Sequence, residues 1–263
     1  MMQRRTLIQG GCALAFGVAT GAQAQIAELN DAINKGGRQR MLSQRLCKAY
    51  IALAQGIEPT RAQDVLDRSM AQFDRQLAEL KAFAGTPELR ATYAALEASW
   101  SEFKATLVGA PAVDAGVPKV MAAAGKVLAL AHQGTQQYEA LQNKPIGKLV
   151  NVAGRERMLS QRMAAFYLAS LVPVDPVGAR AEIAKARTEF LAGLAFIRNA
   201  PEATPRIKDE LQLAEMQWVL YDNALQKAAP AESIRPQADV FIASENVLQV
   251  MDRITTLYSG LKA

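Results

Sequence analysis

Residues 34–50 read NKGGRQRMLSQRLCKAY, and residues 151–167 read NVAGRERMLSQRMAAFY. Ten of these seventeen positions are identical, and most of the identities are polar residues. Apolar positions of a helix interchange at little cost, because a core mainly requires side chains of the right volume. Volume does not account for arginine, serine and glutamine residues that recur at fixed spacing. The chain therefore carries one polar motif twice.

The repetition extends beyond this motif. It is seen in Phe73 and Phe190 at an offset of 117 residues, in Trp100 and Trp218 at 118, and in Tyr138 and Tyr258 at 120. Solenoid repeats are roughly 20–50 residues long, so a period of this length indicates a duplicated domain. We predict one domain over 25–143 and a second over 144–263, and we interpret the tryptophans and these two tyrosines as core residues.

The rest of the chain has the pattern of a helical protein. Apolar residues recur at steps of three and four, as in Leu89, Tyr93 and Leu96, and the alternation typical of strands is missing. Breaks rich in proline and glycine divide each repeat into four helices. The predicted helices are 26–55, 60–84, 87–108, 118–143, 147–171, 178–199, 205–228 and 236–261.

The expected fold is all-α, with two tandem up-down-up-down four-helix bundles that form a pseudo-symmetric pair. An up-down-up-down bundle ends at the end where it began. The short connection at 143–147 can then start the second repeat beside the first. We therefore expect the motif helices, 26–55 and 147–171, to be adjacent and to run in the same direction.

A signal peptide is predicted over residues 1–24. Arg4 and Arg5 precede a stretch of small apolar residues, and residues 22–24 supply the A-x-A pattern of a cleavage site. The paired arginines favour the twin-arginine (Tat) route over the Sec route. The mature protein is expected to be soluble in the periplasm, because no later stretch reaches the ~18 apolar residues of a membrane span.

Composition argues against several classes of function. Removal of 1–24 takes away two arginines and no acid, which lowers the formal charge from +5 to +3, too little and too dispersed for a nucleic-acid surface. Cys47 is the only mature cysteine and His132 the only histidine, so a metal site is not expected. We expect no cofactor, no catalytic residues and no enzymatic activity, since neither a Ser-His-Asp nor a Cys-His set can be assembled.

The polar residues of the motif form stripes on a helix that turns by 100° per residue. Gly37, Arg40 and Gln44 share one stripe, and Arg38 lies on a second. The second repeat has the same arrangement in Gly154, Arg157, Gln161 and Arg155. A glycine inside a helix costs roughly 1 kcal/mol relative to alanine. We expect it to be kept for the close approach of another helix or of a ligand.

This motif resembles the N-terminal sensor domain of PilJ-type pilus chemotaxis transducers and of NarX-type nitrate/nitrite sensor kinases. The resemblance rests on the pattern I-N-x-x-G-R-x-R-M-L-S-Q-R, which starts at Ile33 in the first repeat, and the four-helix arrangement extends it over most of the mature chain. In the NarX branch it implies a small anion held between two parallel motif helices by one arginine from each. The arginine before the motif methionine corresponds to Arg40 and Arg157.

Two hypotheses from different classes follow. The first is a periplasmic sensor-like protein that binds a small oxyanion, with nitrate or nitrite favoured, and presents it to a membrane sensor, a transporter or a pilus transducer. Few acids lie near the motif in the sequence, so facing arginines would repel without an anion or an acid between them. The second is a helical interaction module that docks onto a membrane chemotaxis or pilus transducer, with the polar faces as a structural interface. The candidate ligand-binding residues are Arg40, Arg157, Gly37, Gly154, Gln44, Gln161, Arg38 and Arg155.

Overall fold

The computed structural model describes residues 26–172, 175–227 and 234–262, and the predicted signal peptide lies outside this part. The described residues form eight α-helices, as predicted, and the predicted helix ends lie within three residues of those observed. A short 3₁₀ turn, η1 (Asp114–Gly116), precedes α4. The helices are α1 (Leu29–Ala54), α2 (Pro59–Phe83), α3 (Pro87–Val108), α4 (Val117–Gln142), α5 (Pro145–Ala169), α6 (Pro176–Arg198), α7 (Pro205–Gln226) and α8 (Arg235–Ser259).

Local sequence explains where the helices begin. Proline occupies the first turn of seven of them, where its missing N–H is not needed. The side chains of Thr86 and Thr204 cap α3 and α7 by accepting hydrogen bonds from the backbone N–H groups of Leu89 and Ile207. The two repeats thus start their third helix with the same capping device.

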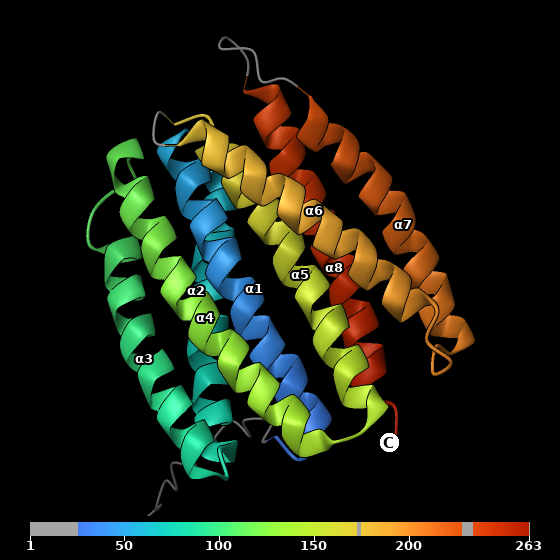
Figure 1. Cartoon of the computed structure of the whole chain (residues 1–263). Helices are drawn as coiled ribbons and strands as arrows, with labels where there is room; N and C mark the ends of the chain where they lie inside the picture. The colour runs from blue at the N-terminus through green and yellow to red at the C-terminus, as the bar shows by residue number, and fades with distance from the viewer. Residues whose placement is uncertain (1–25, 173–174, 228–233, 263) are drawn as a thin grey trace, which may run out of the picture.

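The helices form two four-helix groups that meet along the motif helices. In the first group α1 packs against α2 and α4, and α3 packs against α4; in the second α5 packs against α6 and α8, and α7 packs against α8. The most extensive contact in the molecule joins the groups through α1 and α5, which lie side by side and run in the same direction (Figure 1). The predicted pair of all-α bundles with adjacent, parallel motif helices is confirmed.

Equivalent aromatic residues make equivalent contacts in the two halves. Phe73 stacks on Trp100 with ring centroids 4.0 Å apart, and Phe190 stacks on Trp218 at 4.4 Å. The Tyr138 hydroxyl donates to the carbonyl of Leu80, and the Tyr258 hydroxyl to that of Ile197. These tryptophans and tyrosines are buried, as predicted. The duplication therefore extends to the details of packing.

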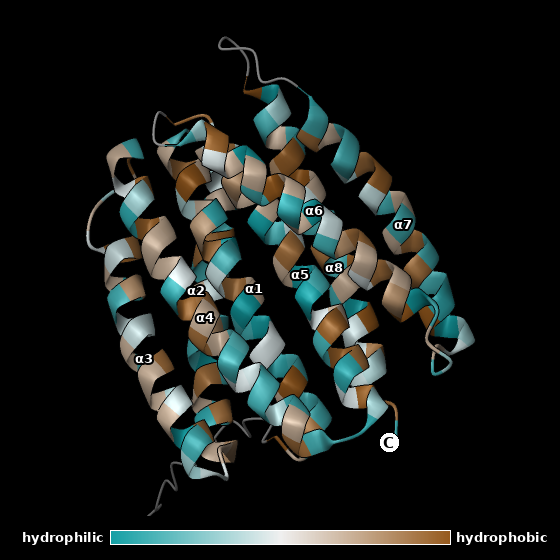
Figure 2. Ribbon diagram, viewed as in Figure 1, coloured by the Kyte–Doolittle hydropathy of each residue, from teal (hydrophilic) through white to brown (hydrophobic). Residues whose placement is uncertain are grey.

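Hydrophobic residues line the faces where helices meet, and hydrophilic residues lie on the outer faces of most helices (Figure 2). Within the described residues, no helix combines the length and the hydropathy that a membrane span requires.

Candidate anion-binding site

The motif helices approach each other closely at Gly37 and Gly154. A Cβ built on Gly37 would lie 3.7 Å from the Gly154 Cα atom, and one on Gly154 would lie 3.8 Å from the Gly37 Cα atom. Each would also lie within 3.1–3.5 Å of the Nη2 atoms of both Arg40 and Arg157. The glycines therefore make room for the opposite helix and for two guanidinium groups, in agreement with the close approach that the motif predicts.

The two arginines are buried and bind across the helix crossing. Arg40 is 1% exposed and Arg157 is 0% exposed. Arg40 Nη2 donates to the backbone carbonyl of Asn151 at 3.1 Å, and Arg157 Nη2 donates to that of Asn34 at 3.0 Å. Asn34 and Asn151 are equivalent residues of the two repeats. The contact is thus pseudo-symmetric, and each arginine reaches into the other half of the molecule.

The remaining contacts of the arginines differ between the halves. Arg157 Nη1 donates to Asp252 Oδ1 at 2.5 Å, whereas Arg40 Nη1 lies 3.2 Å from His132 Nδ1. His132 on α4 and Asp252 on α8 occupy equivalent positions, 120 residues apart. The Arg40 guanidinium therefore has no carboxylate partner among the described residues, whereas the buried Nε atoms of both arginines lack a hydrogen-bond partner there.

The electrostatics follow from this difference. Burial, and then the charges of Arg157 and Arg155, lower the pKa of Arg40 from 12.5 to about 9. Burial also lowers the pKa of Arg157, to about 10, and Asp252 opposes that shift. Both side chains remain cations at neutral pH. The lower pKa of Arg40 reflects a charge that its surroundings stabilise less well than that of its counterpart.

The other predicted ligand residues lie around this crossing. Arg38 donates to Asp252 at 2.6 Å, while its equivalent Arg155 donates to Glu189 at 2.6 Å. Gln44 and Gln161 are buried, and their side-chain amides donate to Ser43 Oγ and to the Ser244 carbonyl, respectively. Arg40, Arg157 and the two glycines therefore meet at one point, whereas Arg38 and Arg155 pair with acids at different helices.

Sequence reasoning missed the acids that accompany the motif. Few acids lie near the motif in the sequence, but α8 brings Asp252 to Arg38 and Arg157, and Glu245 to Arg45 and Lys48. These acids are about 200 residues from α1 in the sequence, and only the fold brings them together. The 120-residue offset of Tyr138 and Tyr258 could have revealed the asymmetry, since it pairs Asp252 with His132.

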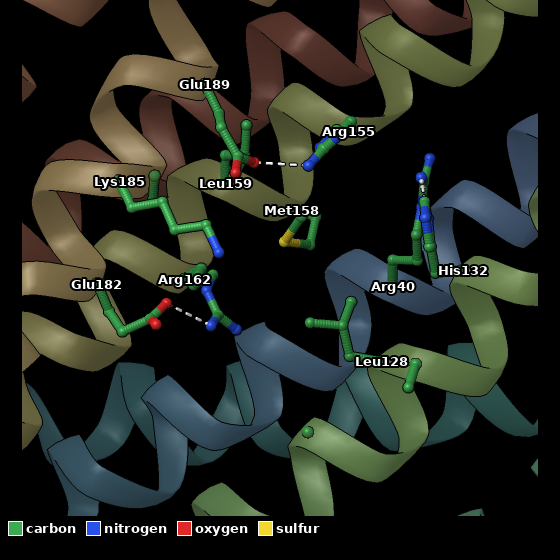
Figure 3. A pocket seen from close by; sticks show the side chains of 13 residues that line it. Arg40, Leu128, His132, Arg155, Met158, Leu159, Arg162, Glu182, Lys185 and Glu189 are labelled. Atoms are coloured by element: carbon green, nitrogen blue, oxygen red, sulfur yellow. Dashed lines mark hydrogen bonds and ion pairs between the residues drawn. The ribbon is translucent and has the colours of Figure 1, made fainter. Parts of the chain in front are cut away.

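Arg40 also lines a cavity between α4, α5 and α6 (Figure 3). The cavity has a volume of about 340 Å³, and Arg155, Arg162 and Lys185 bring three further cationic side chains to it. Arg155 and Arg162 are paired with Glu189 and Glu182 of α6, at 2.6 and 2.7 Å.

The two four-helix bundles meet through parallel motif helices, and buried arginines lie at their contact. This arrangement defines a tandem, sensor-like helical protein. The sequence profile of the PilJ family, described as the N-terminal domain of type IV pili methyl-accepting chemotaxis transducers, matches residues 23–130 and again residues 138–243. The chain belongs to this family and contains two copies of its domain. Searches of curated proteins and of solved structures find no match.

Proposed function

We propose that this protein is a periplasmic, sensor-like binding protein that binds a small oxyanion at the crossing of α1 and α5. Nitrate and nitrite are the favoured ligands. Arg40 and Arg157 are its ligand-binding cations, and Gly37 and Gly154 leave the space for them. The two arginines and two glycines are surrounded by Gln44, Gln161, Arg38 and Arg155. The proposal assigns no catalytic residue, cofactor or metal.

One observation carries the proposal: two buried guanidinium groups meet at the crossing, and among the described residues only that of Arg157 has a carboxylate partner. Like charges in a buried site repel strongly, because the interior screens them less than water does. An anion beside Arg40 would relieve this repulsion, as Asp252 does beside Arg157. It would also offer an acceptor to the Nε atoms of Arg40 and Arg157, neither of which has a hydrogen-bond partner among the described residues.

Titration calorimetry and thermal melting with nitrate, nitrite and sulfate test this proposal. We expect nitrate or nitrite to raise the melting temperature, since a ligand at about 100 times its dissociation constant adds roughly 2.7 kcal/mol to stability. Arg40→Ala should abolish the response, and Arg40→Lys should restore only part of it, because an ammonium lacks the planar guanidinium fork. Lys104→Ala, which removes an exposed cation on α3, is the matched control. Unchanged melting curves at millimolar anion would refute the proposal.

The proposal includes export and domain division. Signal cleavage after residue 24 would release a mature chain with one binding domain at 25–143 and one at 144–263, and a membrane sensor, a transporter or a pilus transducer would read out the bound state. Fractionation of cells that express the protein, with detection in the periplasmic fraction, tests the compartment.

The alternative function, a docking module that binds no small ligand, is supported by a different surface. Met216, Val219 and Leu220 are exposed on one face of α7, at 55, 56 and 60%. The equivalent face of α3, at an offset of 118, carries Ala98 and Ser101 instead. Cross-linking from Val219→Cys to a membrane transducer, without any anion response, would favour this alternative.

A further inference from the structure

The cavity between α4, α5 and α6 has a counterpart in the other half of the molecule. The counterpart lies between α1, α2 and α8 and has a similar volume, about 350 Å³. Their linings correspond at the offsets of the repeat: Arg155 with Arg38 and Arg162 with Arg45 at 117 residues, and His132 with Asp252 and Gly125 with Glu245 at 120. The last two pairs differ, and both take a carboxylate from the first cavity. Glu189, which corresponds to Gln72 at 117 residues, adds one carboxylate to it.

In the counterpart cavity, carboxylates of α8 lie between the cationic side chains. Asp252 bridges Arg38 and Arg157, with contacts of 2.6 and 2.5 Å. Glu245 bridges Arg45 and Lys48, at 2.5 and 2.6 Å. Two carboxylates, seven residues apart on α8, therefore each join two cations. Seven residues of helix span ~10 Å along its axis.

We propose that the cavity between α4, α5 and α6 binds a small organic dicarboxylate, whose two carboxylate groups take the places that Asp252 and Glu245 fill in the counterpart cavity. This site is distinct from the oxyanion site at the helix crossing and shares Arg40 and Arg155 with it. The dicarboxylate proposal does not depend on whether nitrate binds at the crossing.

The cations of the cavity lie in two groups, as a ligand with two charged ends requires. Arg40 and Arg155 lie on the side of His132, and Arg162 and Lys185 lie on the opposite side (Figure 3). Arg155 and Arg162 are seven residues apart on α5, like the two acids on α8. Each end of the ligand would therefore meet two cations.

The middle of the cavity is apolar. Leu128, Met158 and Leu159 belong to its lining, and Met158 lies between the two cationic groups in Figure 3. Such side chains contact a hydrocarbon spacer favourably and offer nothing to a hydrated inorganic anion. This composition favours an organic dicarboxylate over an inorganic ion.

The charge of the cavity also matches a dianion. Four cationic side chains face two carboxylates, Glu182 and Glu189, which leaves an excess of two positive charges while His132 is neutral. Each glutamate is paired with one arginine only, Arg162 or Arg155, at 2.7 and 2.6 Å. No ion pair is found for Arg40 or Lys185 within the described part of the chain.

Gly125→Glu is the sharpest test, because it rebuilds in this cavity the acid that Glu245 supplies in the other. A Cβ built on Gly125 meets no atom within 4 Å, so the longer side chain has space. The new carboxylate would pair with Arg162 and occupy one end of the site. It lies two helical turns from His132 and leaves the arginines of the crossing unchanged.

Calorimetric titration of the purified protein with succinate, adipate, suberate and sebacate, the longest of which span the ~10 Å between the two acids of α8, gives the readout, with acetate and nitrate for comparison. We expect at least one dicarboxylate to bind, and to bind at least tenfold more tightly than acetate, since one charge-assisted contact is worth on the order of tenfold in affinity. Gly125→Glu should weaken dicarboxylate binding at least tenfold and leave the nitrate response unchanged. Gln249→Glu, which adds the same charge to the counterpart cavity, should have no effect on dicarboxylate binding.

Three results would overturn the proposal. They are no heat with any dicarboxylate at millimolar concentration, acetate binding as tight as dicarboxylate binding, and dicarboxylate binding that Gly125→Glu leaves intact. Should Gly125→Glu not fold, as its melting curve would reveal, Arg162→Gln takes its place and must cause the same loss. Failure with nitrate alone refutes only the site at the crossing.

Discussion

Glu156 of the second motif is a buried carboxyl group that should be destabilising at neutral pH. Its side chain is 1% exposed, and neither of its carboxyl oxygens has a hydrogen-bond partner among the described residues. Burial raises its pKa well above the ordinary 4.5, and the nearby Arg155 charge does not offset this. Folding therefore favours the neutral form of Glu156 over its ionised form.

The free-energy consequence can be calculated from the ordinary pKa. In the unfolded chain the carboxyl group ionises at about 4.5, so burying it at pH 7, where the unfolded chain is ionised, costs on the order of a few kcal/mol. The folded pKa is the higher one, so this loss is absent below pH 4.5 and grows as the pH rises towards the folded pKa.

Replacing Glu156 by glutamine removes the ionisation and keeps the shape. We expect Glu156→Gln to stabilise the protein by roughly 2–3 kcal/mol at pH 7, or roughly 5–10 °C in melting temperature, and by nearly nothing at pH 4. Thermal melting of wild type and variant between pH 4 and pH 8 measures the difference directly. A gain that does not change with pH, or no gain at pH 7, would refute the reasoning.

The first repeat provides a matched control for this experiment. Gln39 occupies the equivalent position, is fully buried, and donates from its side-chain amide to the Phe73 carbonyl at 3.2 Å. Gln39→Glu should therefore create the same liability, with a loss of stability at pH 7 that disappears near pH 4. Opposite effects of the two substitutions would show that the carboxyl group is responsible.

Three further predictions concern the crossing, the ion pairs of α8 and export. Gly37→Ala should lower the free energy of unfolding by roughly 1–3 kcal/mol in urea unfolding, because the new Cβ atom would press on the opposite helix and on the guanidinium groups. Gly125→Ala, with open space around it, should be neutral or slightly stabilising. Burial opposes ionisation of Glu245, but the neighbouring lysine and arginine outweigh it and lower the pKa of this carboxyl group from 4.5 to about 2. The pair should therefore contribute on the order of 3 kcal/mol of stability above pH 4.5, which is lost as the pH falls towards 2. Acid unfolding of Glu245→Gln should show a smaller loss over the same pH range. Replacing both Arg4 and Arg5, which lie outside the described residues, by lysine should block periplasmic delivery if export uses the twin-arginine route, and normal delivery in a fractionation assay would indicate the Sec route.

The fold could be predicted because local signals and the repeat agree. Apolar spacing and first-turn prolines placed all eight helices of the described chain, and the even helix count of each repeat placed α1 beside α5. The two motif glycines, which are unfavourable inside a helix, correctly indicated the close approach of two backbones. Each of these inferences depends on residues near one another in sequence or on equivalent residues.

The partners of the motif could not be predicted in the same way. Which acid reaches Arg157 depends on how α8 packs against α5, and Asp252 is 95 residues from that arginine. The burial of Glu156 had no signal in its own repeat, since a glutamate beside two arginines is usually solvated or paired. Only the comparison with Gln39, the neutral residue in the other repeat, points to the lack of a compensating charge.

Duplication within one chain permits an asymmetry that a symmetric dimer of single domains does not. In a symmetric dimer the same residue lines both equivalent cavities, so a carboxylate that fills one also fills the other. Here α4 and α8 have diverged. Asp252 and Glu245 line one cavity, whereas His132 and Gly125 take their places in the other, where Arg40 and Lys185 have no carboxylate partner among the described residues. The filled cavity joins α8 to α1 by ion pairs, at Arg38 and Arg45. Ion pairs already join α5 to α6 in the other cavity, and a dianion bound to Arg40 and Lys185 would add a link from α1 to α6 that exists only while it is bound. The built-in acids thus fix one half of the pair, and the open half is the one whose packing a ligand can change.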